Sequence, residues 1–259
     1  MAELCFYSAA GNRFAVLDAF ERMPADPSAL ALELCGRHGL DGLLVGARPG
    51  ALGDCRMLVF NRDGSRAEAC GNGLRALARW ALESRHCGPA HALTIETDAG
   101  PRRAQCYVRG GEVVAVATEL GVPRVLAAET SLACRRGEVR ATLVDMGNPH
   151  CIVFVPDVAR AEVAALGAEL EHHARFPLRT NVSFVELAGA RLLVRTWERG
   201  VGETAACGTG IGASVVAALV HGRVRTPVEV GTRGGRLSVD WDGAGVLRLT
   251  GPVEALLVA

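Results

Sequence analysis

The sequence predicts an α/β (α+β) protein made of two similar domains related by a pseudo-twofold axis. Each domain is expected to be a mostly antiparallel β-sheet wrapped round a central apolar helix. Three observations predict this fold. The 259 residues suffice for two small domains. Related motifs recur about half a chain apart. Each copy of the motif opens a helix that is apolar on nearly every side, and such a helix must be buried.

Three pairs of short segments carry the repeat, and the two copies in each pair are 136 or 137 residues apart. The pairs are Ala69–Gly73 with Ala206–Gly210, Asn61-Arg62 with Glu198-Arg199, and Gly11-Asn12 with Gly147-Asn148. One such match is easily a coincidence, but three at nearly one offset indicate an ancient duplication.

The elements follow in chain order from hydrophobic periodicity and from Gly, Pro and Asp breakers. Asp26 and Pro27 suit the start of a helix, and Gly39 suits its end. Other helices are expected over 72–84, 158–172 and 209–221. Strands are expected over 4–8, 14–18, 42–46, 56–60, 93–97, 104–108, 113–120, 139–146, 151–155, 182–187 and 192–197, and as short strands with turns over 228–258.

We place the domain boundary near Gly110-Gly111. The first domain is then 1–110 plus 251–259, because the last strand is expected to return to it. The second domain is 111–250. The active site is expected in the cleft between the two domains.

The composition excludes several classes of function. All 28 basic residues are arginine, so a lysine Schiff base, pyridoxal phosphate held by one, and a Walker A P-loop are excluded. The net charge is zero, which disfavours nucleic-acid and membrane partners. The nine cysteines contain no CxxC spacing, so no metal site is expected. With no secretory leader recognisable, free thiols are typical of a cytoplasmic protein.

Two of these cysteines, Cys70 and Cys207, stand in Cys-Gly-X-Gly segments at the start of the two buried helices. Unpaired N–H groups and the helix dipole make such a start a binding place for an anion. The same dipole is expected to lower the pKa of the thiol. Two such units facing each other would place a base on one face of an acidic carbon and an acid on the other. This arrangement predicts inversion of a small substrate without a cofactor.

Three other interpretations compete with this one. A single copy of the motif is typical of a buried cysteine at a tight turn, although two matched copies favour function. Both copies also fit the loose G-x-G-x-x-A pattern of dinucleotide sites. That pattern requires a strand directly before it, and the strand before Cys207 is expected to end near Trp197. A redox-sensing dithiol protein is the non-enzyme alternative.

The asparagines argue against a redox sensor. The chain has only five, and four of them lie in the repeated segments. They are Asn12, Asn61, Asn72, Asn148 and Asn181. This distribution suggests polar contacts to a substrate, although Asn-Gly pairs are also common in turns. Arg199 would suit a substrate carboxylate and Glu198 a substrate ammonium, with a solvated ion pair as the alternative.

In combination and order, these motifs resemble the diaminopimelate epimerase family along nearly the whole chain. The matching segments are Gly11–Phe14, Phe60–Ser65, Ala69–Arg75, Met146–His150, Arg179–Asn181, Trp197–Gly200, Gly202–Thr204 and Ala206–Gly210. The resemblance implies interconversion of LL- and meso-diaminopimelate without pyridoxal phosphate, in the lysine and peptidoglycan pathway. It also implies two similar α/β domains that close over the substrate, as a homodimer.

The resemblance assigns roles to individual residues. Cys70 and Cys207 would be the acid/base pair. His150 and Glu198 would adjust the pKa values of the thiols. The substrate would be held by Asn12, Asn61, Gly71, Asn72, Asn148, Asn181, Glu198, Arg199, Gly208 and Thr209, with Arg199 at the distal carboxylate and the Gly71-Asn72 and Gly208-Thr209 pairs at the reacting one.

The sequence departs from the family at two places. Arg13 stands where the family commonly has Asp, and Asp41-Gly42 stands where some members have a glutamine that lines the site. Related two-cysteine enzymes racemise other amino acids, such as histidine, which leaves a racemase of that kind as the alternative. Retention of Asn61, Asn181 and Arg199 favours diaminopimelate.

Overall fold

The computed structural model describes residues 4–68, 70–87, 91–135 and 137–257, and it is a mixed α/β protein. The chain divides into two compact units: the first ends at Glu119 and takes back the segment from Thr250, and the second is Leu120–Leu249. Gly110-Gly111 is not the boundary. It is the turn of a hairpin inside the first unit, where both glycines have positive φ.

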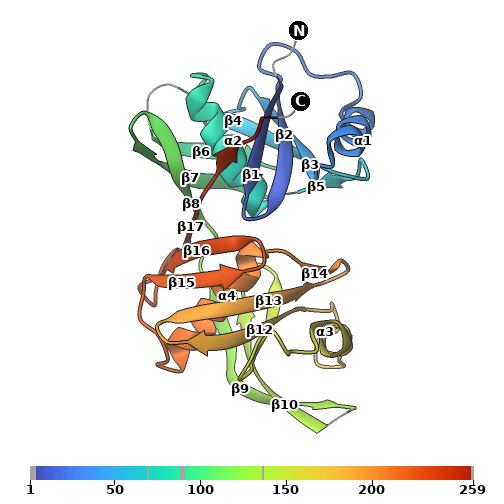
Figure 1. The fold of residues 1–259 in the computed structure, drawn as a ribbon, viewed down its shortest axis with the longest axis vertical. Coiled ribbons are helices and arrows are strands. Elements are labelled where there is room, and N and C mark those ends of the chain that lie inside the picture. The colour runs from blue at the N-terminus through green and yellow to red at the C-terminus, as the bar shows by residue number, and fades with distance from the viewer. Residues whose placement is uncertain (1–3, 69, 88–90, 136, 258–259) are drawn as a thin grey trace. The chain divides into compact units, whose positions relative to one another are not determined.

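The first unit is drawn mostly in blue to green in Figure 1. Its described residues form two helices, and most of its strands precede Glu119 in the sequence. Its elements are β1 (Leu4–Ala9), β2 (Asn12–Asp18), α1 (Pro27–His38), β3 (Gly42–Ala47), β4 (Cys55–Asn61), β5 (Arg66–Ala67), α2 (Gly71–Glu83), β6 (Ala92–Thr97), β7 (Gly100–Arg109), β8 (Glu112–Glu119) and β18 (Glu254–Ala255). Strand β18 pairs with β1, so the end of the chain does return to this unit.

The second unit has the same mixture of elements. They are β9 (Arg124–Cys134), β10 (Gly137–Asp145), β11 (Pro149–Phe154), α3 (Val163–Glu171), β12 (Asn181–Ala188), β13 (Arg191–Glu198), β14 (Gly202–Thr204), α4 (Gly208–Val220), β15 (Val228–Thr232) and β16 (Gly235–Asp240). Strand β17 (Arg248–Gly251) crosses from this unit to the first. No helix among the described residues is long and apolar enough to cross a membrane.

The two units share one pairing scheme. In the first, β1–β2 is antiparallel, β2–β3 parallel, β3–β4 antiparallel and β4–β6 parallel. In the second, β10–β11, β11–β12, β12–β13 and β13–β15 follow the same sequence of directions. The registers correspond as well, since Phe14 pairs with Gly42 and His150 pairs with Asn181. The repeat in the sequence is therefore a repeat in the fold.

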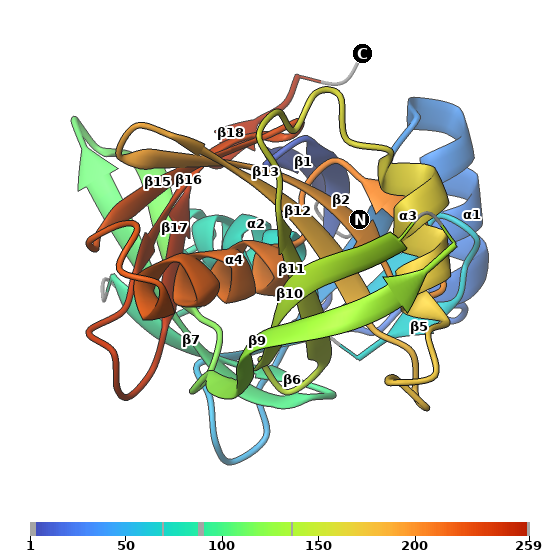
Figure 2. The ribbon, with the colours of Figure 1, turned by 90° about the horizontal axis from the view of Figure 1, so that it is seen from below.

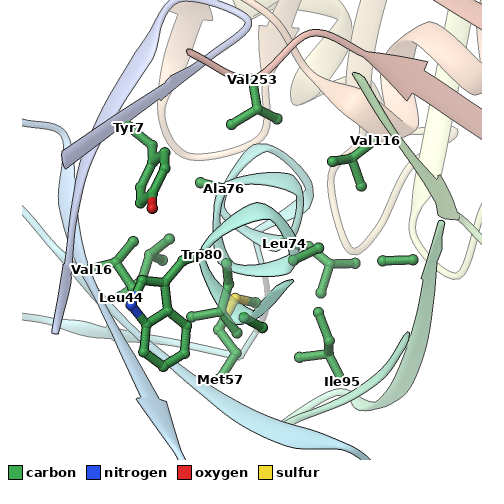
Figure 3. Packing of buried hydrophobic residues seen from close by; sticks show 14 of the residues in the cluster. Tyr7, Val16, Leu44, Met57, Leu74, Ala76, Trp80, Ile95, Val116 and Val253 are labelled. Carbon is green, nitrogen blue, oxygen red and sulfur yellow. The ribbon is translucent and has the colours of Figure 1, made fainter. Parts of the chain in front are cut away.

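Each unit is built round its second helix. In the first unit, α2 is surrounded by apolar side chains from β1, β2, β4, β6 and β8, with Trp80 as its largest buried residue (Figure 3). In the second, α4 is buried along most of its length and packs on β10–β13 (Figure 2). The other two helices, α1 and α3, cover the outer sides of β3–β4 and β12–β13. A mostly antiparallel sheet with a central helix in each half agrees with the predicted fold class.

Two local predictions were wrong. The helix expected over 158–172 begins only at Val163. Before it, Asp157 Oδ1 accepts the N–H groups of the second and third residues after it, and Arg195 donates to three carbonyls of the same stretch. These bonds replace helical ones. Strand β9 was not expected at all, because most of its side chains are exposed and show no alternating pattern.

Candidate active site

Cys70 lies immediately before α2, as the N-cap of the helix. Its extended backbone (φ −143°, ψ 115°) lets Sγ accept the N–H of Gly73 at 3.3 Å. Gly73 is closely packed, because a Cβ there would lie 2.9 Å from Leu44 Cδ2 and that side chain would have to shift. Gly71 has no such neighbour within 4 Å, so the first turn stays open on that side. The sulfur therefore sits beside backbone donors that an anion could reach.

Two predicted substrate residues meet beside this helix start. Asn72 Nδ2 donates to Asn12 Oδ1 at 2.6 Å, which joins α2 to the beginning of β2. Asn72 is buried, and its own Oδ1 accepts from Arg75 Nη2 at 2.6 Å. Arg75 interrupts an otherwise apolar helix, and the sequence alone does not indicate its contact with Asn72.

Asn61 lies at the end of β4, where the register β2–β3–β4 places it near the beginning of β2. It is exposed, and its Nδ2 donates to Ser65 Oγ at 2.9 Å. Its backbone closes the following turn through bonds with Gly64 and Ser65. The structure thus gives Asn61 a turn contact rather than a contact with Asn12 or Asn72.

The second unit gathers its predicted residues at one end of its sheet. Asn148 precedes β11, Asn181 begins β12 and Glu198 ends β13, and the pairings β11–β12 and β12–β13 align these positions. Asn181 ties the segments together, because its Nδ2 donates to Pro149 O at 3.0 Å and its Oδ1 accepts the N–H of Arg199 at 3.0 Å. This convergence could be predicted only once the strand order was known.

Cys207 is the buried N-cap of α4. Its Sγ is 3.6 Å from Thr209 Oγ1, and Asn148 Nδ2 reaches the same hydroxyl at 3.5 Å. Burial raises the pKa of the Cys207 thiol and the charge of Glu198 raises it further, while Gly210 and Thr209 act in the opposite direction. The expectation that the helix dipole lowers the pKa is therefore wrong for Cys207, because removal from water outweighs the dipole.

His150 is fully buried two residues after Asn148. Burial lowers the pKa of its imidazole to about 3, so the ring is neutral at physiological pH. Its Nε2 is 3.1 Å from Asn148 Oδ1, and an amide oxygen only accepts, so Nε2 carries the proton. Its Nδ1 is buried without a partner among the described residues. His150 is thus joined to Cys207 through Asn148 and Thr209.

Glu171, at the end of α3, fixes the loop that carries Glu198 and Arg199. It is 3% exposed and accepts from Trp197 Nε1 at 2.7 Å, from Gly200 N at 2.9 Å and from Arg179 Nη1 at 3.4 Å. Burial alone would raise the pKa of this carboxyl, but the three donors outweigh it and lower the pKa. Nothing in the sequence distinguishes Glu171 from a solvated helix end.

We expect Glu171→Gln to lower the free energy of unfolding by about 2–3 kcal/mol, because an amide NH₂ would face a buried donor. A carboxyl with a lowered pKa stabilises the fold above its ordinary pKa of 4.5, and that contribution is lost as the pH falls through the lower value in the folded state. Denaturant unfolding should therefore show a large difference from wild type at pH 7 that shrinks below pH 4.5. Glu33→Gln, in an exposed pair with Arg37, should change stability by less than about 0.5 kcal/mol. An equal loss in both variants would contradict the role of Glu171.

Comparison with known proteins identifies the family. The model of a family described as diaminopimelate epimerase matches residues 4–126 and 142–256. The chain belongs to the diaminopimelate epimerase family. It is 41% identical over 262 residues to the diaminopimelate epimerase of Desulforudis audaxviator, covering 94% of this chain and 93% of that one. It is 38% identical over 248 residues to that of Moorella thermoacetica, covering 89% and 88%. The resemblance inferred from the motifs is confirmed, and the protein is an isomerase of the amino-acid epimerase type.

Solved structures with low sequence identity share the fold. A phenazine biosynthesis protein of the PhzF family from Bacillus anthracis has a TM-score of 0.73 at 17% identity, covering 98% of this chain and 96% of that one. A hydroxyproline epimerase from Agrobacterium vitis, with bound trans-4-hydroxy-L-proline, has a TM-score of 0.70 at 18% identity, covering 99% and 91%. The same fold therefore occurs in proteins that do not carry the name diaminopimelate epimerase.

The two departures from the family pattern contact each other. The backbone N–H of Arg13 donates to Asp41 Oδ2 at 2.9 Å, and Arg13 Nη1 reaches Gly39 O at 3.4 Å. Gly42 has no room for a side chain, because a Cβ would lie 2.7 Å from Phe60 O. By register, Gly42 is the counterpart of Asn181 in the other unit. The first unit thus has bare backbone where the second has a polar side chain.

Proposed function

We propose that this protein inverts one α-carbon of LL-diaminopimelate to give meso-diaminopimelate, with Cys70 and Cys207 as the two acid/base groups. The observation that carries the proposal is the recurrence of a cysteine N-cap before a buried helix in two units of the same fold. In each unit, asparagines that the resemblance assigns to the substrate lie beside that helix start. The relatives named as diaminopimelate epimerases support the choice of substrate.

Inversion requires that one proton leaves one face of the α-carbon and that another proton is added to the opposite face. A thiolate removes the α-proton, the electron pair of the broken C–H bond spreads into the substrate carboxylate, and the opposite thiol protonates the other face. The pair ends with its protonation states exchanged, and the reverse reaction or exchange with solvent restores them. The N–H groups in the first turns of α2 and α4 would stabilise the developing charge. Because the chain contains no lysine, an imine-bound cofactor is not available to do so.

The remaining parts of the proposal concern the setting of the reaction. The substrate would be held by the asparagines, by Glu198 and by Arg199. The enzyme would act as a homodimer in the cytoplasm, on the pathway to lysine and peptidoglycan precursors. Racemisation of another amino acid, such as histidine, is the alternative, and the Arg13–Asp41 contact beside Gly42 is the observation that favours it.

A deuterium-exchange panel tests the substrate. In D₂O, the protein should incorporate deuterium at the α-carbon of LL-diaminopimelate and form the meso isomer, as followed by proton NMR and chiral chromatography. Histidine and proline, at the same concentration, should exchange at least about 100-fold more slowly, since neither supplies a distal carboxylate. Faster exchange of histidine or proline would assign the enzyme to another amino acid. Exchange of none of them would leave a redox-active dithiol protein.

A further inference from the structure

Arg75 carries a positive charge into the interior of the first unit. Its side chain is fully buried on α2, just beyond the first turn that Cys70 caps. Burial lowers the pKa of its guanidinium to about 10, and the Cys70 sulfur acts in the opposite direction. The group therefore remains protonated at neutral pH. A buried cation is unfavourable unless hydrogen bonds or an opposite charge offset it.

The described residues offset little of this charge. Nη2 donates to Asn72 Oδ1 at 2.6 Å, while Nε and Nη1 are buried with no partner among the described residues. No carboxylate in that part of the chain forms an ion pair with Arg75. The other charged groups of α2, Arg79 and Glu83, pair with each other at 2.7 Å on its later turns. Among the described titratable groups, the Cys70 sulfur acts on Arg75 and raises the pKa of its guanidinium.

The single bond that Arg75 makes also sets the direction of two amides. Because a guanidinium only donates, Asn72 must turn its oxygen toward Arg75 and its NH₂ toward Asn12. Asn12 then accepts through Oδ1, and among the described residues its NH₂ has no acceptor, so it can donate to a ligand. A donor is what a substrate carboxylate requires at that position. Arg75 thus controls the polarity of a residue that the family resemblance assigns to substrate binding.

The second unit has no such cation at the equivalent place. By the offset that relates Cys70 to Cys207, the counterpart of Arg75 is Gly212. A Cβ there would lie 3.1 Å from Met146 Cε and 3.3 Å from Leu247 Cδ2, so apolar side chains already surround this position. Cys207 instead has the carboxylate Glu198 acting on it. Cys70 therefore interacts with a buried guanidinium and Cys207 with a carboxylate, although their helices match.

We propose that Arg75 is a positioning residue of the epimerase reaction, whose buried guanidinium orients Asn72 and Asn12 for the substrate and supplies the positive charge that balances an anionic sulfur at Cys70. The proposal rests on the proposed function only in naming the reaction. It makes Cys70 the thiolate of the substrate-free enzyme and leaves Cys207 as the thiol. The two-base cycle would then begin with the required unequal protonation.

Alkylation of Cys70 in two Arg75 variants tests this role. Arg75→Gln keeps a donor for Asn72 but removes the charge, and Arg75→Lys keeps the charge. At pH 7, iodoacetamide should label Cys70 about three- to tenfold more slowly in Arg75→Gln than in wild type, because fewer sulfurs are ionised. Arg75→Lys should label Cys70 at close to the wild-type rate. Peptide mass spectrometry resolves Cys70 from the other cysteines. In turnover, kcat should fall in Arg75→Gln while KM changes little.

Arg79→Gln is the matched control, because it removes an arginine from the next turn of α2 that bonds Glu83 and two backbone carbonyls. It should leave the labelling of Cys70 unchanged. Wild-type labelling in folded Arg75→Gln, equal slowing in both Arg75 variants, or equal slowing in Arg79→Gln would each overturn the proposal. If Arg75→Gln does not fold, slow labelling in Arg75→Lys overturns it. Labelling needs no substrate, so it stays decisive even if the wild type exchanges no α-proton and the proposed function fails.

Discussion

Alanine at Cys70 or at Cys207 is expected to reduce epimerisation of diaminopimelate by about 10³-fold or more, since general acid–base groups contribute about 10²–10⁴ each. A racemising site must reach both faces of the α-carbon, so the loss of either group stops inversion. One half-reaction can survive. Cys207→Ala keeps the Cys70 sulfur, which can still exchange the α-proton of one diastereomer with solvent. Inversion and deuterium exchange should therefore separate in the single variants and vanish together in the double variant.

The measurements are chiral chromatography for inversion and NMR for exchange, with thermal unfolding to establish that each variant is folded. Cys106→Ala and Cys134→Ala are suitable controls, because neither thiol lies at a helix start. The Cys106 thiol contacts the carbonyl oxygen of Ala78, and Cys134 is the last residue of β9. Both should retain wild-type turnover. If Cys70→Ala or Cys207→Ala inverts the substrate at the wild-type rate, the two-thiol mechanism is wrong.

Local chemistry of the helix starts could be predicted from the sequence, while the electrostatics could not. The motifs at Cys70 and Cys207 differ mainly at one residue, Asn72 against Thr209, so they predict the same dipole effect for both thiols. The structure shows that Cys207 is buried beside Glu198 and that a buried cation acts at Cys70 instead. Burial and the charges that surround a sulfur come from segments distant in sequence. For that reason a rule based on the helix alone gave the wrong direction for Cys207.

The fold could be predicted where buried side chains alternate with exposed ones along a segment, or where they follow one another without interruption. Helix α4 is an example, since eight apolar residues lie between Ile211 and Val220, and the six of them up to Ala218 are buried. Strand β9 is the opposite case, because it is held by pairing with β10 while most of its side chains face solvent. The glycine pair at 110–111 suggests a domain boundary because a hairpin turn and a domain boundary have the same composition. The pairing of β7 with β8 distinguishes them.

The convergence of Asn148, Asn181 and Arg199 depends on the same long-range pairing. Their positions in sequence are far apart, and only the parallel register of β11 with β12 brings the first two together. Asn181 then holds the backbone of Arg199, and Glu171 holds Gly200. The loop that carries the proposed distal-carboxylate ligand is therefore fixed from two sides. A guanidinium on a fixed loop loses little conformational freedom on binding.

Arg199→Met is accordingly expected to lower kcat/KM for LL-diaminopimelate by about 100-fold, or about 3 kcal/mol, the scale of charged hydrogen bonds to one carboxylate. Arg199 is exposed and uses one nitrogen, Nη1, on Leu178 O at 3.1 Å, which leaves the remaining donors of its fork for a ligand. L-lysine is diaminopimelate without the distal carboxylate. Its much slower α-proton exchange should change by less than about threefold in the same variant, because the lost bonds are absent for it already.

Comparing diaminopimelate with L-lysine distinguishes loss of a bond to the distal carboxylate from structural damage to the loop. A general loss of structure at residues 197–200 would slow both substrates alike, whereas loss of the carboxylate ligand affects diaminopimelate alone. Arg191→Met, at the other end of β13 and 3.6 Å from Glu229, removes an exposed arginine of the same strand and should affect neither. Equal losses for diaminopimelate and L-lysine in Arg199→Met would remove Arg199 from the substrate site. They would also leave the Arg13–Asp41 contact as the stronger determinant of specificity.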